Sequence, residues 1–136
     1  PAGFRVPTDY EWANLLDLVD GSSDFTTQTG TGWGGTNAGI KLKSASTYVG
    51  TDPGDGSWSD NANRGTDDYG FGAVPAGWRH LDGTQFYNRG LSAVYWSSSV
   101  GSSTHAWYRA LDYNNAQVGR TLGYRSYGFS VRCVKD

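Results

Sequence analysis

The fold is decided by the segment from Val94 to Val134, which reads VYWSSSVGSSTHAWYRALDYNNAQVGRTLGYRSYGFSVRCV. Apolar and aromatic residues alternate in it with polar ones at a period of two, as expected for half-buried β-strands. The loops between these patterns are rich in Tyr, Asn, Ser and Arg, the residue types that adaptable binding surfaces use. The segment therefore predicts an antiparallel sheet that presents a polar and aromatic face.

One helix is predicted at residues 9–20. Thr8 can cap its start, Glu11 completes a capping box, and Gly21 provides a stop. Trp12 belongs to an apolar stripe at helical spacing. We therefore expect Trp12 to lie in the core rather than to face a ligand.

Residues 21–72 show almost no periodicity, because glycines interrupt every possible element except a short turn at residues 38–42. An irregular segment of this length in a compact domain is usually functional or disordered. Strand patterns resume afterwards, at residues 71–75, 78–80, 94–98, 106–112, 117–120 and 128–134.

The two ends of the chain carry similar patterns, Gly3-Phe4-Arg5-Val6 and Gly128-Phe129-Ser130-Val131-Arg132, which could pair as strands. The expected fold is an α+β domain with one clear N-terminal helix, a long irregular loop region and a late antiparallel β-meander with paired termini. This is the outline of a C-type-lectin-like domain.

Length and composition limit the number of domains and the kinds of partner that are expected. A chain of 136 residues suits a single domain over 1–136. The net charge is −2 and no basic block is present, which argues against nucleic acid as a partner. No apolar run approaches the roughly 20 residues that a membrane-spanning helix needs, so we expect no membrane insertion.

Catalytic patterns are weak in this sequence. His80 and His105 are far apart and lack the ligand spacing of a zinc site. The serines at 97–99 lack the glycine pattern of a nucleophile elbow. Cys133 alone is most simply a small buried hydrophobe in a terminal strand. We therefore predict that the protein is not an enzyme.

The irregular segment is rich in oxygen donors, which suit calcium. The preferred calcium ligands are Asp60, Asp67 and Asp68. Their spacing is not that of an EF-hand, and aspartates also favour turns for backbone reasons. The alternative interpretation of Asp67 and Asp68 is a tight turn that caps the following strand.

Ligand recognition is predicted at the late strands and loops. Trp96 and Trp107 fall within strand patterns and are expected in the core. Around them cluster side chains that can stack on a ligand or form directional hydrogen bonds. These candidate binding residues are Tyr108, Arg109, Asp112, Tyr113, Asn114, Asn115, Arg120, Tyr124 and Arg125. For any one of them, an ordinary solvated turn residue is the alternative.

Several blocks along the chain resemble the Fibrobacter succinogenes major paralogous domain family. They are GFRVPT at 3–8 with Glu11-Trp12, LKS at 42–44, GTDDYGF at 65–71, PAGWR at 75–79, YWSS at 95–98 and GFSVRCV at 128–134. The resemblance implies a secreted or surface protein of Bacteroidota or Fibrobacterota. It also implies kinship with the C-type-lectin and formylglycine-generating-enzyme fold group. That enzyme chemistry needs a pair of reactive cysteines, and this chain has one.

The resemblance also bears on Cys133. Family members usually carry a Cys directly ahead of the block that begins here with Pro1, so the domain is expected to lack an upstream segment. In the family pattern that Cys is a natural disulfide partner for the residue matching Cys133, which suits an oxidising compartment. Cys133 is accordingly expected to lie close to Pro1.

Together these features predict an extracellular or cell-surface recognition module that binds a glycan or a protein through its late loops and strands. Calcium is a possible cofactor. The alternative is a structural subunit of a surface or extracellular assembly, in which the same aromatic surface packs against copies of itself.

Overall fold

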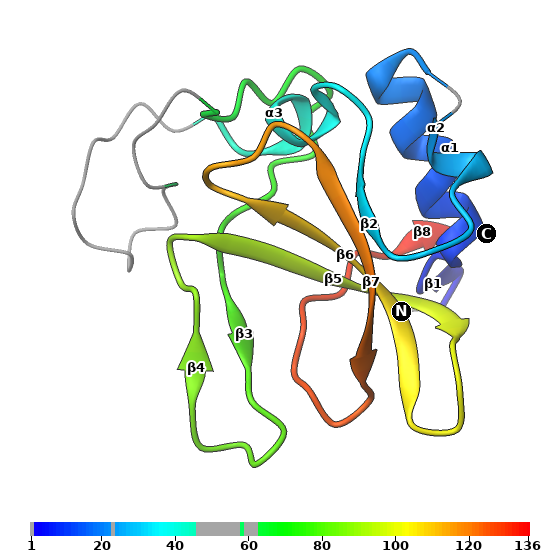
Figure 1. The fold of residues 1–136 in the computed structure, drawn as a ribbon, viewed down its shortest axis with the longest axis vertical. Coiled ribbons are helices and arrows are strands. Elements are labelled where there is room, and N and C mark those ends of the chain that lie inside the picture. The colour runs from blue at the N-terminus through cyan, green and yellow to red at the C-terminus, as the bar shows by residue number, and fades with distance from the viewer. Residues whose placement is uncertain (1, 23, 46–57, 59–62) are drawn as a thin grey trace.

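The structure is a computed structural model that describes residues 2–22, 24–45, 58 and 63–136. Figure 1 shows how its helices and strands are arranged. In chain order they are β1 (Phe4–Arg5), α1 (Asp9–Asp20), α2 (Asp24–Thr27), β2 (Gly32–Gly34), α3 (Ala38–Leu42), β3 (Trp78–Arg79), β4 (Phe86–Tyr87), β5 (Ser92–Val100), β6 (His105–Asp112), β7 (Val118–Tyr124) and β8 (Val134–Lys135). The chain is an α+β domain, as predicted.

A four-stranded antiparallel sheet with the order β2-β7-β6-β5 forms the centre of the fold. Its strands β5, β6 and β7 are the predicted meander, with Tyr108 of β6 opposite both Trp96 of β5 and Thr121 of β7. β2 pairs with β7 at the edge and places Trp33 opposite Gly119. The sequence did not predict β2, because two of its three residues are glycines and its extended form depends on pairing with β7.

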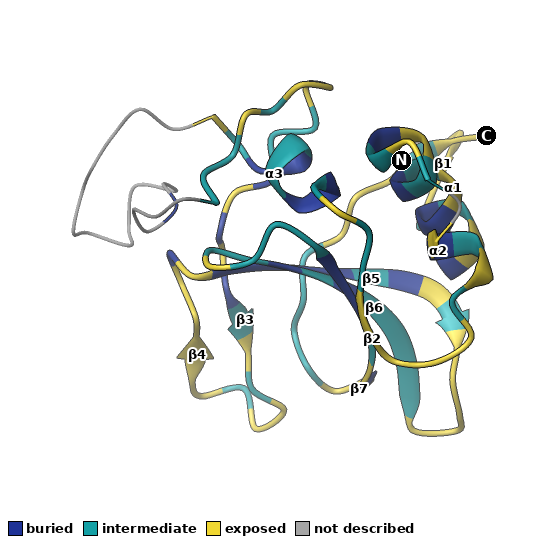
Figure 2. Cartoon of the chain, turned by 45° about the horizontal axis from the view of Figure 1, so that its top comes forward, coloured by how far each residue is buried: buried dark blue, intermediate teal, exposed yellow. Residues whose placement is uncertain are grey.

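The three helices lie on one side of this sheet, as Figure 2 shows. One continuous core fills the space between the helices and the sheet. It includes Trp12 and Leu16 of α1, Phe25 of α2, Leu42 of α3, Tyr95 of β5, Leu111 of β6 and Val118 of β7. Side chains alternate along a strand, so the neighbours of these strand residues point to the other face of the sheet.

α1 begins and ends where the sequence predicted. The Thr8 side chain accepts a hydrogen bond from the Glu11 N–H, and the Glu11 carboxylate accepts one from the Thr8 N–H. Gly21 ends the helix with a left-handed φ of 77°. Trp12 is buried, and its indole N–H donates to the Trp96 carbonyl at 3.3 Å. The prediction that Trp12 belongs to the core is confirmed.

The two ends of the chain meet, as predicted, but the C-terminal partner is residues 134–135 and not the expected residues 128–132. β1 pairs with β8, with Phe4 opposite Lys135 and Arg5 opposite Val134. The Arg5 guanidinium reinforces this pair, because it lies 2.9 Å from an Asp136 carboxylate oxygen and donates to Glu11 at 2.7 Å.

Cys133 departs from its predicted position in a core strand. Residues 128–134 do not form the predicted strand, since they pair only at single bridges, from Gly128 to Arg79 and from Ser130 to Tyr95, before β8 begins at Val134. Cys133 follows these bridges as an exposed, free thiol. Pro1 lies outside the described residues, so its expected proximity to Cys133 stays a prediction.

Of two shorter strand predictions, one is wrong and one is confirmed. Residues 71–75 contribute a single bridge, from Ala73 to Lys43, in place of a strand. The strand expected at 78–80 is β3, which forms a separate two-stranded sheet with β4. This hairpin extends from the same end of the fold as the 125–130 loop in Figure 1.

Candidate ligand-binding groove

The face of the sheet away from the helices carries a groove of about 660 Å³. On β6, Arg109 and Leu111 are buried on the helix side, so the alternate residues Tyr108, Ala110 and Asp112 point into the groove. We call this feature the sheet groove. Its main lining side chains are Trp33, Trp78, Asn88, Tyr108, Asp112, Thr121, Tyr127 and Phe129.

Trp33 forms a supported platform at one side of the sheet groove. Its indole lies over Gly119, where an added Cβ would be 3.3–3.4 Å from three atoms of the six-membered ring. Similar distances to three ring atoms indicate that the ring packs face-on against the backbone. The side chain is nevertheless 42% exposed, so glycine at 119 lets the indole rest on β7 while part of it stays open to solvent.

The opposite side of the sheet groove is a wall of packed aromatic rings. Phe129 stacks on Tyr127 with ring centroids 5.7 Å apart and contacts Tyr108 at 4.7 Å. Trp78 meets Tyr127 edge-on at 5.3 Å. Main-chain hydrogen bonds between Arg79 and Gly128 hold the two segments of the wall together, at 2.8 and 2.9 Å. The wall is therefore fixed by its backbone as well as by ring packing.

Asp112 supplies the carboxylate of the sheet groove. Its Oδ1 accepts a hydrogen bond from the Ser92 hydroxyl at 2.6 Å, and among the described residues no group donates to its Oδ2. A tyrosine phenol is protonated at neutral pH, and burial raises the pKa of Tyr108 further above its usual value. The groove thus offers both a hydrogen-bond acceptor and a hydroxyl group.

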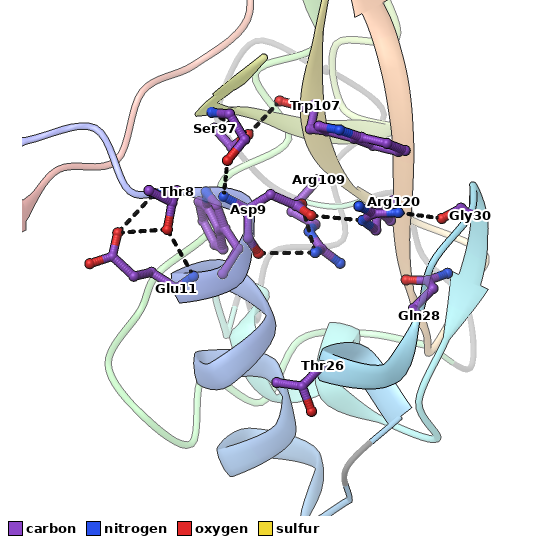
Figure 3. Close-up of polar contacts among 12 residues, drawn as sticks. Thr8, Asp9, Glu11, Thr26, Gln28, Gly30, Ser97, Trp107, Arg109 and Arg120 are labelled. Atoms are coloured by element: carbon purple, nitrogen blue, oxygen red, sulfur yellow. Dashed lines mark hydrogen bonds and ion pairs between the residues drawn. The ribbon is translucent and has the colours of Figure 1, made fainter. Parts of the chain in front are cut away.

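Arg109 and Arg120 form polar contacts with α1 and with the segment before β2, as Figure 3 shows. Arg109 is fully buried and donates to Asp9 Oδ1 at 2.7 Å and to the Asp9 carbonyl at 3.2 Å. Arg120 donates to Asp9 Oδ2 at 2.8 Å and to the Gly30 carbonyl at 2.6 Å. Its guanidinium also lies 3.6 Å from the centre of the Trp107 ring.

These contacts correct the expectation that Arg109 binds a ligand directly. A side chain with no exposed surface and a carboxylate partner in the core cannot reach a surface ligand. Arg120 does line the sheet groove, but its Nε and Nη1 donate to Asp9 and to the Gly30 carbonyl. The two arginines position α1 against β6 and β7.

The other candidate binding residues lie outside the groove lining. Tyr113 packs against the core, and Asn114 is exposed beside it. Asn115 accepts a hydrogen bond at its carbonyl from Lys43. Tyr124 stacks on His105 with centroids 4.2 Å apart. Arg125 is an exposed residue of the β7 turn whose N–H donates to Thr104.

The predicted calcium ligands are not brought together by the part of the chain that the structure describes. Asp67 has a positive φ of 51°, and its carboxylate accepts the Gly72 N–H at 2.7 Å. The Asp68 N–H donates to the Lys41 carbonyl. Asp60 lies outside the described residues, and within them no group of three acidic, His or Cys side chains could hold a metal. Asp67 thus forms the turn that was the alternative interpretation.

Lys43 is an unexpected buried cation beside the groove. It has no exposed surface, and its ammonium donates to the carbonyls of Asn63 at 3.1 Å and Asn115 at 2.8 Å. Its Nζ also lies 5.0 Å from the centre of the Trp58 ring. Burial lowers the pKa of Lys43 to about 8, and the attraction of Asp112 opposes that change.

Sequence reasoning found Tyr108, Asp112 and Arg120 of the groove but missed the aromatic residues contributed by other segments. Trp33 was passed over because it lies in a glycine-rich stretch without periodicity. The available signal was the sequence Gly-Trp-Gly itself, since a Trp flanked by glycines has few local side chains to bury it.

A family model described as the Fibrobacter succinogenes major domain matches residues 1–135. The chain belongs to this family. All the residues that line the sheet groove therefore lie within the family domain. A search of curated proteins and a search of solved structures gave no match. Within the described residues, no helix has the length and apolar character needed to cross a membrane.

Proposed function

We propose that this domain is a non-enzymatic recognition module, located outside the cell or at its surface, that binds a glycan or a protein in the sheet groove. The observation that carries the proposal is the groove itself. It combines an exposed, backbone-supported Trp33 with a fixed aromatic wall and a carboxylate whose Oδ2 accepts from no residue that the structure describes. Concave aromatic surfaces with a few placed polar groups are typical of ligand sites.

The fold supports the same proposal. We also propose that the domain is C-type-lectin-like, a proposal supported by its paired termini, its helix after the first strand and its late meander. A sheet packed on one face against helices keeps its other face rigid. Rigid aromatic side chains contribute contact area at a small loss of conformational entropy.

The experiment is binding of the purified domain to a glycan array and to an array of extracellular matrix proteins. Thr121→Arg places a long charged side chain on the groove floor and is expected to abolish binding to whichever probe is recognised. Leu18→Arg adds the same side chain to an exposed position of α1 and should leave binding unchanged. Absence of binding to every probe, or equal binding by both variants, would contradict the proposal.

A further inference from the structure

The chemistry of the sheet groove narrows the class of ligand. Trp33 provides an aromatic face that rests on Gly119. Aromatic faces carry negative charge density, and they attract the weakly positive C–H bonds on one side of a sugar ring. Gly119 lies opposite both Trp33 and Ala110 in the sheet. Thr121 and Asp112 are each two residues from this row along their strands, on the same face of the sheet but in opposite directions.

The charges of the groove argue against an acidic ligand. Arg120 is the one basic residue among the described residues that line it. Its Nε and Nη1 donate to Asp9 and to the Gly30 carbonyl, and it lies opposite Arg109, so its side chain points to the helix side of the sheet. An acidic group would therefore meet no available cation and would approach Asp112. Burying a charge without a partner is costly.

The carboxylate of Asp112 is suited to hydroxyl groups. Ser92 fixes one of its oxygens at 2.6 Å and leaves the other to accept from a ligand. The nearby buried ammonium of Lys43 attracts Asp112, which offsets part of the negative field in the groove. A neutral hydroxyl donor therefore fits this position better than an added cation.

From these observations we propose that the sheet groove binds a neutral hexopyranose glycan, with one sugar ring stacked on Trp33 and hydroxyl groups bonded to Asp112 and Thr121. The inference rests on the proposed function and specifies its ligand.

The test uses matched pairs of oligosaccharides that differ only by oxidation of C6 to a carboxylate. Such pairs are glucan and glucuronan, and mannan and mannuronan, each pair with the same β-1,4 linkage. We expect calorimetry to detect binding to at least one neutral member, with its oxidised partner binding about tenfold more weakly or less. Equal or tighter binding of the oxidised partner would overturn the inference, as would preference for an amino sugar polymer such as chitosan.

Two substitutions locate the interaction. Trp33→Ala should weaken binding of the neutral glycan about tenfold or more, as loss of an aromatic contact residue does, and Trp33→Phe should retain part of the affinity. Asp112→Asn should reduce discrimination between the neutral and oxidised partners. The melting temperature of each variant serves as the folding control. Full affinity in Trp33→Ala would overturn the inference.

The outcome also separates this inference from the proposed function. If only an acidic glycan or a protein binds, and Thr121→Arg abolishes that binding, the ligand assignment fails while groove recognition stands. If no glycan and no protein binds, both fail.

Discussion

Lys43 is the residue whose role the sequence hid most completely. Lysines are usually exposed, yet this one is buried and joins the carbonyls of Asn63 and Asn115. Asn115 belongs to the turn that follows β6, and Asp112 of the groove lies at the end of that strand. Lys43 therefore ties the irregular segment to the edge of the sheet groove.

This burial predicts a pH dependence of stability. The folded-state pKa of Lys43 is lowered to about 8 from the ordinary value of 10.5. Between these values the unfolded chain binds more protons than the folded one, so stability rises with pH. The measured quantity is the difference in the free energy of unfolding between the wild type and Lys43→Met. This difference should increase by up to about 3 kcal/mol from pH 8 to pH 10.5.

Urea denaturation at a series of pH values measures this difference. Subtracting the variant curve removes the contribution of groups that titrate alike in both proteins. A difference that stays flat, or falls, over this window would show that the charge on Lys43 is not held at a cost in the folded state.

Arg109 shows that a sequence signal can be present and still be overlooked. It lies two residues from Leu111 on the same strand, so alternation places both on the buried face. Because charged residues usually stay in water, alternation alone does not predict a buried arginine. The partner that makes the burial possible is Asp9, which is distant in the chain.

At the scale of elements, Asp9 joins α1 to the sheet. The carboxylate accepts from both Arg109 and Arg120, and no other described carboxylate lies within ion-pair distance of either guanidinium. Asp9→Ala leaves two cations without this partner and is expected to lower the free energy of unfolding by about 3–5 kcal/mol. Asp24→Ala, in the exposed first turn of α2, is the matched control and should change it by about 0.5 kcal/mol or less.

Denaturation of both variants at neutral pH provides the measurement. A loss of less than about 1 kcal/mol in Asp9→Ala would indicate that the cluster does not anchor the helix, because breaking a buried pair normally costs several times more.

Helices and strands could be predicted from the sequence where residues within or next to them define their ends. α1 was predicted to the residue because Thr8, Glu11 and Gly21 define its ends without help from the rest of the chain. β2 and α2 were not predicted, since they are short and depend on contacts with β7 and α1. The 128–134 segment has strand-like alternation but pairs only at single bridges.

At the scale of the whole molecule, the fold divides the sheet into a structural face and a recognition face. The helices cover the first (Figure 2). The second gathers Trp33, Trp78, Tyr108 and Tyr127 from four separate segments. Sequence alternation indicated a polar, aromatic face on the late strands, but only the three-dimensional arrangement shows which distant residues complete it.

The central claim is that the sheet groove is the recognition site. The most direct test is a nitrogen–proton correlation spectrum of the labelled domain, titrated with the tightest ligand from the two arrays and read at the tryptophan indole signals. We expect the signals of Trp33 and Trp78 to shift, and the signal of Trp58, whose indole donates to the Ala73 carbonyl in the core, to stay unchanged. Trp12 lines a separate apolar cavity of about 280 Å³ beside Cys133. A shift of Trp12 with Trp33 and Trp78 unchanged would contradict the claim.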